Sequence, residues 1–180
     1  MQIVTSSPDS RWPEIEQGYV RILLEARQYV YMETPYFLPT EPILFAMRTA
    51  AVGGVDIRLL LPLHSDSKLT EWASRSYVME TIEAGVKVYF YKPRFNHAKL
   101  LVSDDQLVSV GSANVDFRSF ENNFEANAFI YDEPLAKQFK QIVLDDLSES
   151  ILLDDTTDLE HRPFIKRLWE SLVRLMAPLL

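Results

Sequence analysis

Residues 96–120 read NHAKLLVSDDQLVSVGSANVDFRSF, and two short apolar runs inside this stretch decide how the chain folds. Ala98–Ser103 and Leu107–Gly111 are both rich in β-branched and apolar residues, which favours two strands. Asp104 and Asp105 lie between them, and aspartates are common in tight turns. The stretch therefore predicts a β-hairpin, in which the two aspartates shape the turn.

Polar side chains with phosphate-binding chemistry lie at the open end of this hairpin. Alternate residues of a strand point to the same side, so His97 and Lys99 share a face. Gly111 allows a tight turn after the second strand, and Ser112 and Asn114 follow it. If the strands pair, these groups converge. An imidazole can attack phosphorus, while an ammonium and polar donors stabilise charge on the phosphate oxygens. Considered alone, His97 would be interpreted as a structural histidine.

Outside the hairpin, amphipathic helices alternate with short apolar strands. The expected helices are Glu14–Ala26, Glu41–Ala51, Lys68–Ala84 and Pro134–Leu147. The further expected strands are Gln28–Glu33, Val55–Leu63, Val86–Tyr91 and Glu125–Tyr131. This order predicts an α/β sandwich, in which a mixed β-sheet lies between helices.

The last thirty residues differ from the rest. Leu147–His161 is acidic and weakly patterned, which favours a connector. Residues 162–180, RPFIKRLWESLVRLMAPLL, carry an apolar stripe opposite basic residues and predict an amphipathic helix. We expect residues 1–150 to form one domain and residues 151–180 to form this connector and helix. The helix either packs on the domain or lies at an anionic membrane surface.

Composition narrows the class of function. The 180 residues are 47% hydrophobic, contain no cysteine and carry a formal net charge of −8. The lack of cysteine excludes a disulfide scaffold, thiol catalysis and a cysteine-ligated zinc site. The acidic balance counts against nucleic acid as a partner. No apolar run approaches the length of a membrane span, and no secretory signal opens the sequence.

Two further side chains could act with His97. Glu125 begins an otherwise apolar strand, and its carboxylate could accept from the second ring nitrogen and fix the tautomer. The alternative interpretation of Glu125 is a solvent-exposed residue at the end of a strand. His64 follows a strand end and could approach the site, although a loop residue is the simpler interpretation. His161 is expected at the start of the last helix.

The spacing of the hairpin residues matches a known pattern. His97-x-Lys99, four residues, Asp104, six residues, then Gly111-Ser112-x-Asn114 resembles the motif of the phospholipase D superfamily. Other stretches resemble its bacterial cardiolipin synthase branch, including TPYFLP, GVDIRLLLP, SDSKLTEWASRSY, AGVKVYFYKPRFNHAKL, NVDFRSFENNFEANAFIYD and the closing RPFIKRLWESLVRLMAPLL. This resemblance covers nearly the whole chain and implies a phospholipase D-like αβα fold.

The resemblance also implies a mechanism and a role for each residue. His97 would attack the substrate phosphorus and form a phosphohistidine, and a second histidine would protonate the leaving alcohol. Lys99, Ser112 and Asn114 would hold the phosphate, and Glu125 would orient His97. Asp104 would support the fold more than touch substrate. Neither a metal nor a cofactor is implied.

Enzymes of this family use two copies of the motif, and this sequence contains one. Residues 1–150 would then be a catalytic half-domain, completed by an N-terminal half or by a second copy of the chain. Trp72 or Tyr77, if exposed near the site, would mark that contact. The resemblance implies phosphatidylglycerol or another anionic phospholipid as substrate, a membrane surface as partner, and no nucleic acid. It places the whole enzyme at the cytoplasmic membrane, with the isolated fragment soluble or peripheral.

Two other functions stay open at this point. The first is a phosphodiesterase or nuclease of the same superfamily that acts as a homodimer. The second is a non-catalytic half-domain that only binds lipid or a partner, although the intact motif argues against it.

Overall fold

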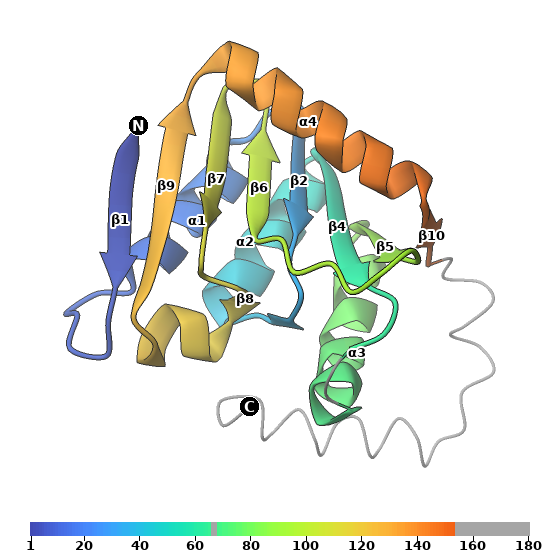
Figure 1. Ribbon diagram of the computed structural model, residues 1–180, viewed down its shortest axis with the longest axis horizontal. Coiled ribbons are helices and arrows are strands. Elements are labelled where there is room, and N and C mark those ends of the chain that lie inside the picture. The colour runs from blue at the N-terminus through green and yellow to red at the C-terminus, as the bar shows by residue number, and fades with distance from the viewer. Residues whose placement is uncertain (66–67, 154–180) are drawn as a thin grey trace.

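A computed structural model describes residues 1–65 and 68–153, which form an eight-stranded mixed β-sheet (Figure 1). The strands lie in the order β1-β9-β7-β6-β2-β4-β5-β10. Their bounds are β1 (Gln2–Ser6), β2 (Tyr29–Glu33), β4 (Asp56–Pro62), β5 (Lys87–Tyr91), β6 (Leu100–Ser103), β7 (Leu107–Gly111), β9 (Glu125–Tyr131) and β10 (Ser150–Leu152). Strands β2, β4 and β5 are parallel to one another, and the other neighbouring pairs are antiparallel.

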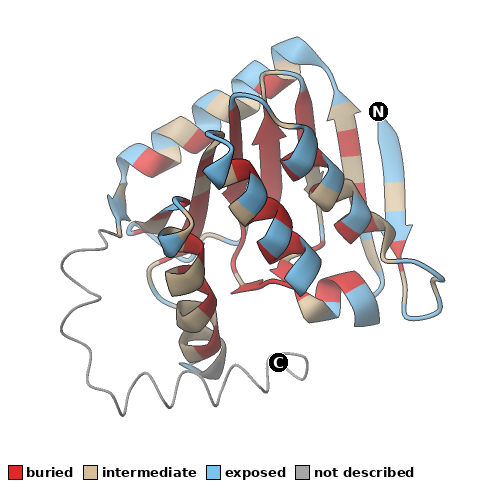
Figure 2. Ribbon diagram, turned by 180° about the vertical axis from the view of Figure 1, so that it is seen from behind, coloured by how far each residue is buried: buried red, intermediate tan, exposed pale blue. Residues whose placement is uncertain are grey.

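Helices cover both faces of the sheet. The first three, α1 (Glu14–Glu25), α2 (Glu41–Val52) and α3 (Lys68–Glu83), lie on one face, and α4 (Glu133–Ser148) crosses the other (Figure 1). Figure 2 shows that α1, α2 and α3 turn their buried sides toward the sheet. The expected α/β sandwich with a mixed sheet is confirmed, and the expected helices begin and end within one or two residues of their observed bounds.

The central strand β2 separates two apolar layers. Val30 and Met32 face the layer under α1 and α2, whereas Tyr29 and Tyr31 face the layer under α4. All five residues of β2 are buried. A strand covered on both faces has no exposed side, which explains why its sequence shows no alternation of apolar and polar residues.

The β6–β7 hairpin forms as expected, and Asp104 holds it against the rest of the sheet. Asp104 and Asp105 have φ angles of 51° and 56°, as a tight hairpin turn with two left-handed central residues requires. The Asp104 carboxylate accepts hydrogen bonds from the backbone N–H groups of Arg27, Gln28 and Tyr29 at 2.7, 3.0 and 2.9 Å. The turn is therefore fastened to the start of β2.

The short elements were not expected from the sequence. β1 pairs with β9 at one edge of the sheet, and β3 (Phe37–Leu38) pairs with β8 (Val115–Asp116) in a small parallel ladder. A π-helical turn, η1 (Arg118–Asn122), follows β8. Each of the short strands is paired with a segment distant in the sequence, so local composition gives little sign of it.

The expectation of a connector over Leu147–His161 is wrong for its first residues. Helix α4 continues to Ser148, and β10 pairs antiparallel with β5, where it completes an edge that would otherwise be open. The remainder of that segment from residue 154 onward, including His161, lies outside the described residues. The expected helix at 162–180 also lies outside them. Within residues 1–65 and 68–153, no helix is both long and apolar enough to cross a membrane.

Candidate active site

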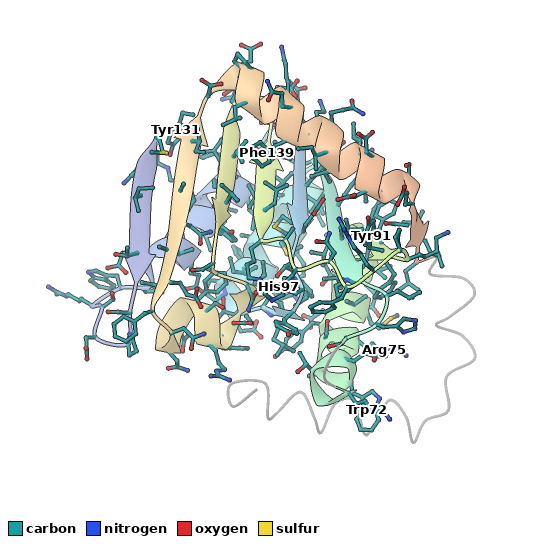
Figure 3. The ribbon with its side chains drawn as sticks, in the orientation of Figure 1. Trp72, Arg75, Tyr91, His97, Tyr131 and Phe139 are labelled. Atoms are coloured by element: carbon teal, nitrogen blue, oxygen red, sulfur yellow. The ribbon has the colours of Figure 1, made fainter. Side chains whose placement is uncertain are left out.

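Strand direction brings the predicted site residues to one edge of the sheet. The parallel strands β2, β4 and β5 all end at this edge, and the antiparallel β6 and β9 begin there. His97 and Lys99 precede β6, the turn at 111–114 follows β7, and Glu125 opens β9. In Figure 3, His97 lies at this edge, below the start of β6. Ligands commonly bind at the carboxyl ends of parallel strands, which favours this edge as the site.

His97 and Lys99 are in direct contact. The Lys99 Nζ atom lies 3.2 Å from each ring nitrogen of His97 and 3.0 Å from its carbonyl oxygen. A neutral imidazole is the form able to attack phosphorus, and only one of its two ring nitrogens can accept a hydrogen bond from the ammonium. Burial lowers the pKa of Lys99, and the charges of Glu125 and Asp116 act in the opposite direction.

Aromatic rings flank the exposed His97 side chain. The ring of Phe95 lies 5.7 Å from the His97 ring at an interplanar angle of 33°, and the ring of Tyr36 meets it edge-on at 6.5 Å. These rings limit the orientations of the imidazole while leaving it open to solvent. Tyr36 comes from the loop after β2, within the stretch TPYFLP.

The turn at 111–114 requires glycine and is held by a buried amide. A Cβ atom on Gly111 would lie 2.2 Å from the Ala126 carbonyl oxygen, which leaves no room for a side chain. Asn127 is 1% exposed, and its Oδ1 accepts from the backbone N–H of Ala113 at 3.2 Å. Its Nδ2 donates to the hydroxyl groups of Tyr19 and Ser109 at 3.0 and 3.2 Å. The sequence analysis did not identify Asn127.

Ser112 and Asn114 are held by different partners. The Ser112 hydroxyl accepts from the backbone N–H of Ala126 at 3.0 Å, and Ser112 is exposed to solvent. The Asn114 amide donates to Asp116 at 3.0 Å, while its buried Oδ1 has no hydrogen-bond partner among the described residues. Asp116 also accepts from the backbone N–H of Ser119 at 2.7 Å. Asn114 is thus fixed by a small network that the sequence did not predict.

Glu125 lies at the same edge, but its hydrogen bond goes elsewhere. Its Oε1 accepts from Asn123 at 3.2 Å, and its charge acts on Lys99. Among the described residues it has no hydrogen bond to His97. The orienting role of Glu125 therefore stays a prediction.

Asp104 is not part of this group. It lies at the opposite end of β6 from His97, where it binds the three backbone N–H groups at the start of β2. This position agrees with the expectation that Asp104 supports the fold. Asp104 is therefore far from the other five candidate residues. These all lie where β2, β4 and β5 end, here called the active edge, and they are His97, Lys99, Ser112, Asn114 and Glu125.

Three other sequence candidates have mixed outcomes. His64 is exposed in the loop after β4, so it lies at the active edge, and its role stays a prediction. Tyr77 is 4% exposed and belongs to the core, so the idea that it marks an exposed contact is wrong. Trp72 is partly buried against that core, and Figure 3 places it at the end of α3 away from His97.

Known proteins match both the sequence and the fold. A family profile described as "Cardiolipin synthase, PLD-like domain" matches residues 19–147. Cardiolipin synthase of Clostridium perfringens is 42% identical over 99% of this chain and 37% of its own length. Cardiolipin synthase 1 of Staphylococcus aureus and the major cardiolipin synthase of Bacillus subtilis are each 42% identical over 100% of this chain and 36–37% of their own lengths.

Two solved structures have the same fold at low sequence identity. The phospholipase D family member Nuc from Salmonella typhimurium superposes with a TM-score of 0.72 at 18% identity, covering 86% of this chain and 97% of that one. Phosphatidylserine synthase from Haemophilus influenzae superposes with a TM-score of 0.76 at 16% identity, covering 99% of this chain and 47% of that one.

The chain spans little more than a third of the length of the curated relatives, so only the matched region is shared. Within that region the family profile covers most of the described fold, from α1 to α4, and includes every residue of the active edge. The chain therefore belongs to the cardiolipin synthase family of phospholipase D-like domains.

Proposed function

We propose that this chain supplies half of the active site of an enzyme that joins two phosphatidylglycerol molecules into cardiolipin and releases glycerol. The contact between Lys99 and both ring nitrogens of His97, at 3.2 Å, carries the proposal. It places an imidazole, which can act as a nucleophile, beside a cation that can balance the charge of a phosphodiester. The cardiolipin synthases that the chain resembles supply the substrate class.

The proposed reaction has two displacement steps. A His97 ring nitrogen forms a bond to the phosphorus of the first lipid, and the bond from phosphorus to the glycerol oxygen breaks. The glycerol oxygen takes a proton from an acid on the opposite side. A hydroxyl group of the second lipid then forms a new bond to phosphorus and gives its proton to the group that acted as the acid, and the phosphorus–nitrogen bond breaks. Lys99, Ser112 and Asn114 hold the phosphate oxygens in both steps.

The acid in the first step comes from a second motif. His97 cannot attack the phosphorus and protonate the leaving oxygen from the same side, because an in-line displacement places these groups on opposite sides. The second histidine comes from an N-terminal half or from a second copy of this chain across a two-fold axis. The reaction takes place at the surface of the cytoplasmic membrane, where the lipid substrates are.

Charge and apolar surface favour a lipid over a nucleic acid. The net charge of −8 opposes binding to a polyanion whose affinity depends on many phosphate contacts. A pocket of about 200 Å³ between α3, β5 and β10 is lined by Leu63, Val78, Met79, Phe90, Ile151 and Leu153, with Arg75 beside them. Tighter binding to single-stranded DNA than to phosphatidylglycerol vesicles, at one salt concentration, would instead support a nuclease.

The test is formation of the phosphohistidine. The purified chain and its His97→Ala variant are incubated with phosphatidylglycerol vesicles, and glycerol, cardiolipin and protein-bound phosphorus are measured. A phosphorus–nitrogen adduct survives alkali and is lost in acid. We expect it, together with glycerol release, in the wild-type chain and not in His97→Ala. Asn122→Ala, at an exposed position, is the control, and His64→Ala tests whether the other described histidine contributes.

Cardiolipin from the wild-type chain alone would mean that two copies complete the site. An adduct without cardiolipin would mean that another half supplies the rest. The proposal is wrong if neither adduct nor glycerol appears when the chain is concentrated or is mixed with the N-terminal half of a cardiolipin synthase.

A further inference from the structure

A buried acid lies behind the active edge, on the face of the sheet opposite to Lys99. Glu33 is the last residue of β2 and is 3% exposed. Its Oε2 accepts a hydrogen bond from the Asn96 side-chain amide at 3.0 Å. Its Oε1 is buried and has no hydrogen-bond partner among the described residues. An ionised carboxylate with a bare, buried oxygen is costly, so this group needs a further explanation.

Asp146 of α4 provides that explanation. It lies close to Glu33, where its charge and its capacity to share a hydrogen bond with a protonated carboxyl group both raise the pKa of Glu33. Two ionised carboxylates cannot bond to each other, because neither has a proton to donate. If one of them carries a proton, the bare oxygen of Glu33 gains a partner and the like charges no longer repel.

The surroundings of the pair favour the protonated form. Burial is the main cause that raises the pKa of Glu33 to about 7, and the Asn96 hydrogen bond acts in the opposite direction. Burial and the charge of Glu149 raise the pKa of Asp146 as well, while Tyr91 and Arg94 act in the opposite direction. The charge of Asp145 also raises the pKa of Asp146, and these are the titratable groups that act on the pair from α4, β5 and the loop before β6.

Asn96 connects this pair to His97. While its amide nitrogen donates to Glu33, its Oδ1 accepts from the backbone N–H of Ala98 at 2.9 Å. One side chain therefore closes a turn around His97 and anchors that turn to β2. Because His97 is exposed and its segment precedes β6, the Asn96 anchor, together with the hydrogen bond from the Gly111 N–H to the Lys99 carbonyl oxygen at 3.4 Å, ties this segment to the sheet.

We propose that Glu33 and Asp146 share one proton between β2 and α4, and that this pair positions His97 through Asn96. Glu33 and Asn96 are positioning residues, since neither is placed in contact with the reacting atoms. The shared proton stands independently of the activity, whereas the effect on catalysis rests on the proposed function.

The first experiment measures the proton directly. Carboxyl ¹³C NMR of the whole chain follows the titration of Glu33, whose signal is assigned by its loss in Glu33→Gln. We expect a midpoint near 7 in the wild type. In Asp146→Asn the midpoint should fall by at least one pH unit, because the new amide donates to an ionised Glu33. A wild-type midpoint near the ordinary value, or one unchanged in Asp146→Asn, would overturn the shared proton.

Stability against pH gives a second readout. The folded state holds the proton at a pH where the unfolded state has lost it, so this contribution declines as pH rises from about 4.5 to about 7. Glu33→Gln should remove that decline, whereas Glu83→Gln, which removes an exposed carboxylate, should keep it. A decline of equal size in both variants would contradict the proposal. If Glu33→Gln does not fold, Asp146→Asn serves in its place.

The positioning role is tested by the split between kcat and KM. Glu33→Leu and Asn96→Ala should each lower kcat about tenfold with little change in KM, and the double variant should lose little more. Glu33→Gln should restore most of the kcat that Glu33→Leu loses, since an amide can accept from Asn96 and donate to Asp146. Folded single variants with wild-type kcat would overturn the positioning role. If neither the chain nor its mixture with the N-terminal half of a cardiolipin synthase forms an adduct or releases glycerol, the proposed function is refuted, and the titration still decides the shared proton.

Discussion

Lys99 is partly buried in the candidate site, and burial lowers the pH at which its ammonium group loses its charge. Because burial lowers its pKa from the ordinary 10.5, the ammonium is lost at a lower pH than for an exposed lysine. We therefore expect the alkaline limb of the kcat/KM profile to lie below that value. Lys99→Arg should move the limb upward, because arginine stays charged, and Lys99→Met should lower kcat/KM about a hundredfold throughout.

The pH profile of cardiolipin formation checks this prediction. Because Arg is larger than Lys, the absolute rate of Lys99→Arg is less informative than the position of its limb. An identical limb in the wild type and in Lys99→Arg would mean that another group titrates there.

Asn127 is the residue on which the 111–114 turn depends. Truncation to Ala leaves three groups without their partner: the Ala113 N–H and the hydroxyls of Tyr19 and Ser109. We expect Asn127→Ala to lower the free energy of unfolding by about 3 kcal/mol, measured by urea denaturation. Asn122→Ala, at an exposed position of η1, is the control and should change it by less than about 0.5 kcal/mol. Equal stabilities of the two variants would refute the role of Asn127.

The sequence predicted which candidate residues lie close together, but it did not predict the residues that support them. His97, Lys99 and Asn114 have a fixed spacing in one hairpin, so local pattern was enough to place them on one edge. Asn127 and Glu33 lie inside strands of apolar residues and act through partners distant in the sequence. A polar residue at the buried end of a strand was the available signal, and it becomes specific only when the partner strands are known.

Among the elements, the β6–β7 hairpin best tests how much the geometry of one turn contributes to stability. Its turn is fastened by the three hydrogen bonds that Asp104 accepts from the start of β2. We expect Asp104→Ala to lower the free energy of unfolding by about 3 kcal/mol, because three backbone N–H groups lose a charged acceptor. Asp9→Ala, at an exposed loop position, is the matched control.

The position of Asp104 also separates stability from chemistry. Because it lies at the far end of β6, the kcat of the folded fraction of Asp104→Ala should equal that of the wild type. A kcat that falls more than tenfold in fully folded protein would instead place Asp104 in the reaction.

Long elements were predictable and short ones were not. The helices and the strands of four or more residues follow hydrophobic patterns that a single sequence displays, so their bounds agree within one or two residues, apart from the edge strand β1. β3, β8 and β10 have two or three residues each, and their pairing depends on the position of the whole sheet. Tertiary context, not local propensity, makes these segments strands.

At the scale of the whole molecule, mixing experiments can identify the source of the second histidine. If two copies of this chain complete one site, His97→Ala will form mixed dimers that lack one of the two histidines. Adding it to a fixed amount of wild type should then reduce cardiolipin formation in proportion to the mixed dimers. If a different half supplies the histidine, wild-type activity should stay constant. Analytical ultracentrifugation of the same mixtures gives the dimer fraction independently.

β10 has a consequence for the solubility of the fold. It adds three residues to the β5 edge and leaves Ile151 and Leu152 each 47% exposed. A chain cut after Glu149 would present β5 as a bare edge, which is a template for pairing with other molecules. We expect that shortened chain to scatter light and sediment as aggregates, whereas one cut after Leu153 should stay dispersed. Three residues at the margin of the sheet would then decide whether it remains dissolved or grows into fibrous material.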